Sequence, residues 1–95
     1  MKEEILKSGA ANWYHGFGSK GGKLILTNET LYFEGHKVNV GKKEFEVELE
    51  NITNVKKGFP NNLIIETING SETFAVFGGK EWVNSIQSAI KKLRG

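Results

Sequence analysis

Apolar and polar residues alternate strictly along one stretch of the chain, residues 43–50. Phe45, Val47 and Leu49 stand between glutamates at every second position, which is the period of a strand with one face in a core and the other in water. We therefore predict a strand over this whole stretch, with carboxylates on its solvent face.

Two hairpins are predicted from turn sequences between shorter β-rich segments. The segments are residues 23–27 paired with 31–34, and residues 63–68 paired with 73–77. Asn28-Glu29 separates the first pair and Asn69-Gly70 the second. Asn and Gly tolerate the positive φ angles that a type I′ turn demands, so we place the second turn on Asn69 and Gly70.

The hydrophobic period becomes that of a helix after residue 79. Apolar side chains then recur on one stripe, which consists of Trp82, Ile86, Ala89, Ile90 and Leu93. This pattern predicts an amphipathic C-terminal helix of about fifteen residues. Lys91, Lys92 and Arg94 fall in its last turn, where positive charge opposes the negative end of the helix dipole.

Short strands at residues 10–15 and 52–55 bring the predicted set to about seven, all before the helix. Such a series hides its apolar faces most simply in a strongly bent sheet or partly open barrel with the helix over one end. The 95 residues suffice for one core, so we expect a single domain over residues 1–95. Of the 12 glycines, we expect Gly9, Gly35 and Gly41 at strand bends and Gly16, Gly18, Gly21 and Gly22 in one loop.

The composition removes several kinds of chemistry. There is no Cys and no Asp, so all 11 acids are Glu, and disulfides, thiolate metal sites and Cys nucleophiles are excluded. His15 and His36 have no i, i+4 partner and no zinc or hydrolase motif around them. We predict a non-enzymatic protein without a metal or a cofactor.

Charge and hydropathy narrow the choice of partner and compartment. The net charge of +2 is far from the basic bias of a dedicated nucleic-acid binder and argues against such a partner. No apolar run approaches the roughly 18 residues of a membrane-spanning helix, and residues 1–7 lack the pattern of a signal segment. We expect a cytoplasmic protein that is able to associate with a membrane surface.

Residues 16–21 match the G-x-G-x-x-G pattern of nucleotide-binding loops literally. A dinucleotide site needs a helix directly after the last glycine, whereas residues 23–27 are β-rich. A kinase loop needs Asp for magnesium and for the catalytic base, and the chain has none. The segment is therefore interpreted as a hairpin loop, either plain or with backbone N–H groups that cradle an anion.

Several of these segments together resemble the GRAM branch of the pleckstrin-homology-like superfamily. The resemblance rests on GKLILTN at 22–28, LYF at 31–33, FEVEL at 45–49 leading into ITNV at 52–55, FAVF at 74–77 and the helix that bears Trp82. It covers nearly the whole chain and implies a mainly β fold, a seven-stranded, strongly bent and partly open barrel capped by the helix. It also implies a role in binding membrane lipid or protein rather than catalysis.

The resemblance further implies that the loops between strands one and two and between strands three and four lie at the same end of the barrel. Lysines from both loops are then predicted to converge on an anionic lipid or phosphoinositide-like headgroup. The candidates are Lys20, Lys23, Lys37, Lys42 and Lys43. Phe17 and Phe59, in predicted loops beside basic residues, are predicted to insert into the membrane interface.

The alternative function is that of a protein-interaction adaptor. Such a domain accepts a peptide by strand addition at an exposed strand edge, or in a groove beside the helix. Convergence of the five lysines away from the glutamates of residues 44–50 favours lipid binding, and scatter favours the adaptor.

Overall fold

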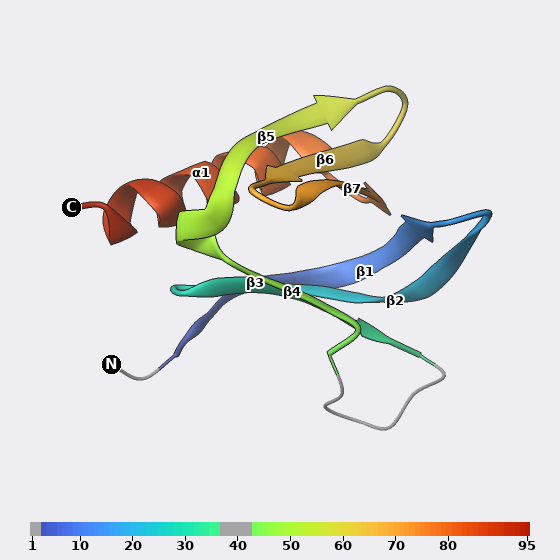
Figure 1. Ribbon diagram of the computed structural model, residues 1–95, viewed down its shortest axis with the longest axis horizontal. Coiled ribbons are helices and arrows are strands. Elements are labelled where there is room, and N and C mark those ends of the chain that lie inside the picture. The colour runs from blue at the N-terminus through green and yellow to red at the C-terminus, as the bar shows by residue number, and fades with distance from the viewer. Residues whose placement is uncertain (1–2, 37–42) are drawn as a thin grey trace.

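The computed structural model describes residues 3–36 and 43–95, which form seven strands and one C-terminal helix (Figure 1). The strands are β1 (Ile5–His15), β2 (Gly18–Thr27), β3 (Thr30–Gly35), β4 (Phe45–Glu48), β5 (Ile52–Gly58), β6 (Asn62–Thr67) and β7 (Gly70–Val76). A short 3₁₀ turn, η1 (Leu49–Asn51), joins β4 to β5, and α1 (Gly79–Leu93) follows β7. The predicted series of strands before one helix is confirmed.

The strands form a single antiparallel sheet in the order β4-β3-β2-β1-β7-β6-β5. The sheet bends so strongly that β1–β4 and β5–β7 lie in two layers, and α1 runs alongside the second layer (Figure 1). This is the predicted bent barrel with its helix. The strand order leaves β4 and β5 at the two edges of the sheet, where, within the described residues, each strand pairs with one neighbour only.

The core fills the space between the two layers and the helix. Along β2, Gly22, Leu24 and Leu26 are buried on the inner side at every second position, as the strand period requires. The largest fully buried side chains are Trp82, Phe33, Phe74, Leu24, Leu26, Leu31, Leu49, Leu63, Ile65 and Ile86. Each of the large apolar groups stabilises the fold by about 1.5–3 kcal/mol through its removal from water.

The strand predicted over residues 43–50 ends earlier than its alternation indicates. The structure forms β4 only to Glu48, and Leu49 enters η1 with its side chain fully buried. The backbone N–H of Leu49 donates to the carbonyl of Glu29 at 2.9 Å. Burial of Leu49 continues the alternating pattern through the corner, so period alone does not show where the strand stops.

The turn predicted at Asn69-Gly70 lies one residue earlier. Thr67 pairs with Gly70, so the turn residues are Ile68 and Asn69, and Gly70 begins β7 with φ +127°. The Thr67 hydroxyl accepts from the N–H of Asn69 at 3.1 Å and donates to the carbonyl of Gly70 at 2.9 Å. A threonine side chain therefore sets the position of this turn, which Asn-Gly statistics do not anticipate.

The prediction of one loop that contains Gly16, Gly18, Gly21 and Gly22 is also wrong, because the last three belong to strand β2. His15 pairs with Gly18, which leaves a turn of two residues, Gly16 with φ +64° and Phe17. A Cβ on Gly22 would come within 2.7 Å of the Phe33 ring. These glycines therefore permit close packing and a tight turn, and β2 pairs with β1 along the whole stretch that was interpreted as a possible anion cradle.

Candidate functional site

Two phenylalanines stand exposed at one end of the molecule, which we call the phenylalanine end. Phe17 occupies the β1–β2 turn and Phe59 the β5–β6 loop, with relative exposures of 113% and 92%. Figure 1 shows this turn, in blue, and this loop, in yellow, together at the right-hand end of the longest axis. That axis extends over 38 Å. Exposed large apolar side chains that gather on one part of a surface mark an interaction site.

The β5–β6 loop is held by bonds that leave Phe59 outside. Gly58 pairs with Asn62, so the loop has three residues, and its Phe59-Pro60 peptide bond is cis. The Lys57 Nζ donates to the carbonyl of Pro60 at 3.3 Å. The N–H of Val76 donates to the carbonyl of Asn61 at 3.0 Å, which ties the loop to β7. The loop is thus connected through its backbone and its apolar side chain remains free of the core.

A third exposed phenylalanine lies beside this loop. Phe77, 85% exposed, follows β7 and lines a shallow hollow of about 350 Å³ together with Asn61. Small residues of β1 and β2, such as Ala10 and Gly21, also line the hollow. The hollow adjoins the β5–β6 loop through Asn61, and no residue of the β1–β2 turn is in its described lining.

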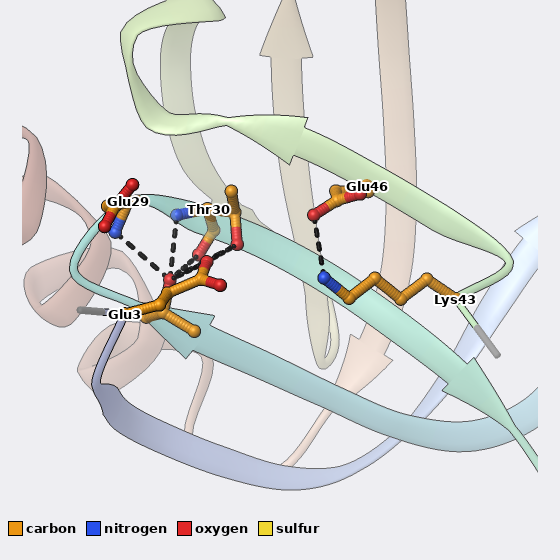
Figure 2. A network of polar contacts seen from close by, with 6 residues as sticks. Glu3, Glu29, Thr30, Lys43 and Glu46 are labelled. Carbon is orange, nitrogen blue, oxygen red and sulfur yellow. Dashed lines mark hydrogen bonds and ion pairs between the residues drawn. The ribbon is translucent and has the colours of Figure 1, made fainter. Parts of the chain in front are cut away.

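Two of the predicted lysines are engaged by glutamates. Lys20 Nζ lies 2.8 Å from an oxygen of Glu44, whose side chain is only 13% exposed. Lys43 Nζ lies 2.9 Å from an oxygen of Glu46, as Figure 2 shows, and 4.4 Å from the centre of the Tyr32 ring. The hydrogen bond to Glu46 is the main reason that the pKa of Lys43 is raised. An anionic ligand at either lysine would compete with a carboxylate.

The remaining candidates do not join these two. Lys23 is exposed on the face of β2 opposite to Lys20, because side chains alternate along a strand. Within the described ranges Lys23 has no ion pair. Lys37 and Lys42 lie outside the described residues. The three lysines that the structure describes therefore do not form one cluster, an outcome that counts towards the adaptor, and headgroup binding by the set of five stays a prediction.

The two histidines have different surroundings. His15 packs its ring against Trp13 with 4.4 Å between centroids, and His36 lines the hollow beside Gly21. Over residues 3–36 and 43–95, no group of three potential metal-ligating His, Cys, Asp or Glu side chains comes together. The hollow at His36 has no carboxylate in its described lining, so a histidine–carboxylate pair is not assembled there.

A polar network around the β2–β3 turn was not predicted from the sequence. One oxygen of Glu3 accepts from the hydroxyl of Thr27 at 2.7 Å and from that of Thr30 at 2.6 Å. Figure 2 shows Glu3 beside Thr30. These two bonds, that from Thr30 first, lower the pKa of Glu3. Thr27 also accepts from the backbone N–H of Glu29 at 3.1 Å and of Thr30 at 2.9 Å. We call this network of Glu3, Thr27, Glu29 and Thr30 the threonine end.

A groove of about 530 Å³ separates β5 from the C-terminal half of α1. Thr53 and Asn54 line it from the strand, and Ile90, Lys91 and Arg94 from the helix. The sequence predicted a groove beside the helix without naming the residues that form it. Within the described part of the chain, no helix is long and apolar enough to cross a membrane.

The same arrangement of strands and helix occurs in several solved structures. The C-terminal domain of an unknown protein from Leishmania infantum superposes with a TM-score of 0.80 at 20% identity, over 93% of this chain and 84% of that one. The N-terminal PH domain of human ARAP2 gives 0.77 at 15% identity, over 92% and 80%. The carboxyl-terminal PH domain of pleckstrin gives 0.74 at 20% identity, over 90% and 97%. These matches define the fold as PH-like.

The family is shown by the sequence itself. The profile of the GRAM domain matches residues 1–94, so this chain belongs to the GRAM domain family. A search of curated proteins gives no significant match. The protein is a GRAM/PH-like binding module, a class that is typically non-catalytic.

Proposed function

We propose that the domain binds the surface of anionic membranes, with its phenylalanine end directed into the bilayer interface. The observation that carries this proposal is the full exposure of Phe17 and Phe59 at the same end of the molecule (Figure 1). Insertion of aromatic side chains at loop tips into the interface lowers the free energy of the system, because acyl chains and headgroups replace water around the rings. Binding of this kind is reversible and needs no membrane-spanning segment.

The apolar contribution alone gives weak binding. Full burial of a phenylalanine contributes about 1.5–3 kcal/mol, and an interface only partly buries it. Lys20 follows Phe17 by three residues, and Lys56 and Lys57 precede Phe59. A free lysine near an anionic surface adds about 1 kcal/mol, and the ion pairs of Lys20 with Glu44 and of Lys56 with Glu66 reduce this attraction. The apolar and charged contacts together support peripheral association.

The predicted lysines retain a part in this proposal. A surface ion pair such as Lys20–Glu44 contributes about 0–1 kcal/mol, which is similar to the attraction that an anionic lipid offers one lysine. The free energy of replacing Glu44 by a headgroup at Lys20 is therefore close to zero, and the same holds for replacing Glu46 at Lys43. We propose that Lys20, Lys23, Lys37, Lys42 and Lys43 contribute to headgroup attraction while the phenylalanines provide insertion.

Co-sedimentation with vesicles tests the proposal. The wild-type chain and the variant Phe17→Ser/Phe59→Ser are compared on phosphatidylcholine vesicles with and without about one fifth phosphatidylserine. We expect binding that needs the anionic lipid and an affinity loss of about tenfold or more in the variant, equal to at least about 1.4 kcal/mol. The control is Ile5→Ser, which removes an exposed apolar side chain at the start of β1, far from the phenylalanine end (Figure 1).

Two results contradict the proposal. One is the absence of sedimentation at low salt, where the Debye length of about 30 Å leaves surface charges unscreened. The other is equal binding of wild type and the double variant. Loss of binding in Ile5→Ser as well would show that exposed apolar residues act without regard to position, which also contradicts insertion of one end.

A further inference from the structure

The edge of strand β5 is open beside a groove that the membrane proposal does not use. Within the described residues, the backbone of β5 pairs only with β6. In an antiparallel strand with one neighbour, about half of the N–H and C=O groups point away from that neighbour. Ile52 and Val55 are buried beneath the strand, while Thr53 and Asn54 are exposed. β5 therefore offers backbone hydrogen-bonding groups above an apolar floor.

The helix supplies the second wall of this groove. Gln87, Ile90, Lys91 and Arg94 face β5 across a volume of about 530 Å³. The pairing of β5 with β6 shifts register between Ile52 and Asn54, so the regular edge that an added strand would continue begins at Asn54 and follows the usual rise of about 3.3 Å per residue. Ile90 is partly buried against the core and provides apolar contact for one side chain of such a segment.

The charges of the groove select the kind of segment. Lys91 and Arg94 are exposed and, in the portion of the chain that the structure describes, have no ion pair. The groove has no carboxylate side chain in its described lining. Because the negative end of the helix dipole lies here, some of this positive charge offsets the dipole, but the side chains themselves extend into solvent. Acidic side chains on an incoming strand are complementary to this wall.

We propose that the β5–α1 groove binds an extended acidic segment of a partner protein. The segment adds as a strand to the open edge of β5, and its carboxylates pair with Lys91 and Arg94. Residues of β5 near the η1 corner and the last turns of α1 form the groove, and Figure 1 places both at the left-hand end, away from the phenylalanine end. This inference is independent of membrane binding, and both contacts can be made at once.

The probe for this proposal is a fluorescein-labelled peptide of alternating Val and Glu, with an alternating Val and Lys peptide as its charge control. Fluorescence anisotropy is measured with the wild-type chain, with Lys91→Glu/Arg94→Glu, and with the matched variant Lys80→Glu/Lys92→Glu. The matched pair changes the net charge equally, and neither Lys80 nor Lys92 lines the groove. We expect the wild type and matched variant to bind the Glu peptide, and the groove variant to bind it at least about tenfold more weakly.

Strand addition has its own readout. A Val-Glu peptide that is N-methylated at every second residue keeps its charge but loses the N–H groups of one edge, so we expect it to bind at least about tenfold more weakly than its parent. In ¹⁵N spectra, we expect the parent peptide to shift the amides of Thr53 and Asn54. Phe17→Ser/Phe59→Ser is expected to bind the peptide like wild type, which separates this site from the membrane site.

Three results would overturn the proposal. Equal loss of Glu peptide binding in the two charge variants would show a response to net charge only. Undiminished binding of the N-methylated peptide would exclude strand addition. If the Glu peptide fails to bind wild type while Lys91→Glu/Arg94→Glu loses vesicle binding, the basic wall belongs to a membrane contact instead.

Discussion

The phenylalanine end and the threonine end lie at opposite ends of the longest axis (Figure 1). Side chains close the turn at one end and are left exposed at the other. At the threonine end, Thr27 is 2% exposed, and its hydroxyl bonds a carboxylate and two backbone N–H groups. At the phenylalanine end, a turn of two residues needs only the positive φ of Gly16, and the Phe17 side chain makes no contribution to closing it. A turn closed by its backbone leaves its side chain available for a ligand.

This difference between the two ends predicts that substitutions at one end change stability and substitutions at the other change membrane binding. Substitutions at the threonine end are expected to change the free energy of unfolding and leave vesicle binding intact. Substitutions at the phenylalanine end are expected to do the reverse. Each of the following predictions tests one side of that separation.

The largest expected effect on stability comes from Thr27→Val. Valine keeps the shape of threonine but removes the hydroxyl, so the N–H groups of Glu29 and Thr30 and the carboxylate of Glu3 lose a partner. Loss of partners in a partly buried site costs about 1–3 kcal/mol. Urea unfolding measures this loss, and vesicle co-sedimentation at a temperature where the variant is folded is expected to match wild type.

Thr67→Val is the matched control for that substitution. Thr67 makes the same kind of bonds to Asn69 and Gly70, but its turn is exposed and water replaces the lost hydroxyl. We expect a cost below about 1 kcal/mol. Equal losses in the two variants would mean that the turn motif, and not its burial with Glu3, determines the stability of the threonine end.

A smaller effect is expected from the titration of Glu3. Because hydrogen bonds from Thr30 and Thr27 lower its pKa in the folded state, this carboxylate stabilises the fold fully above its unfolded pKa of about 4.3 and loses that effect as the pH falls through its folded pKa. The difference in urea midpoint between about pH 7 and pH 3.5 should therefore be smaller in Glu3→Gln than in wild type. Glu4→Gln is the matched control, because the described bonds of Glu4 use its backbone.

The smallest effect on stability is expected at the phenylalanine end. Phe17→Ser/Phe59→Ser removes apolar area that is already exposed in the folded state, so the free energy of unfolding should change by no more than about 0.5 kcal/mol. Urea unfolding under the conditions of the vesicle assay measures it. A loss as large as that of Thr27→Val would show that these side chains pack, and would remove the separation between the two ends.

The fold could be predicted because its main elements follow from local periodicity. Val47 alternates with its neighbours as a half-exposed strand requires, and Trp82 and Ile86 recur with the period of a helix. What could not be predicted depends on contacts between segments. Gly22 belongs to a strand because Phe33 packs against it, whereas composition alone places clustered glycines in a loop.

In the candidate site, too, some features could be predicted from the sequence and others depend on contacts between distant segments. The position of Phe17 and Phe59 in connections between strands was predicted from the sequence, whereas their exposure comes from the structure. The ion pair of Lys20 with Glu44 and the bond of Glu3 with Thr27 each join residues that are 24 positions apart. Spacing along the chain contains no signal for such partners, since the β2–β3–β4 register brings Glu44 to β2.

The position of the chain ends has a practical consequence for orientation. Figure 1 shows that the beginning of β1 and the end of α1 both lie at the left, on the side away from the β1–β2 turn. A fluorophore, an affinity tag or a surface linker attached at either end of this chain would therefore point away from Phe17 and Phe59. A domain immobilised through either end presents its phenylalanines to vesicles in solution. Attachment through the β1–β2 turn would instead hold the phenylalanine end against the support.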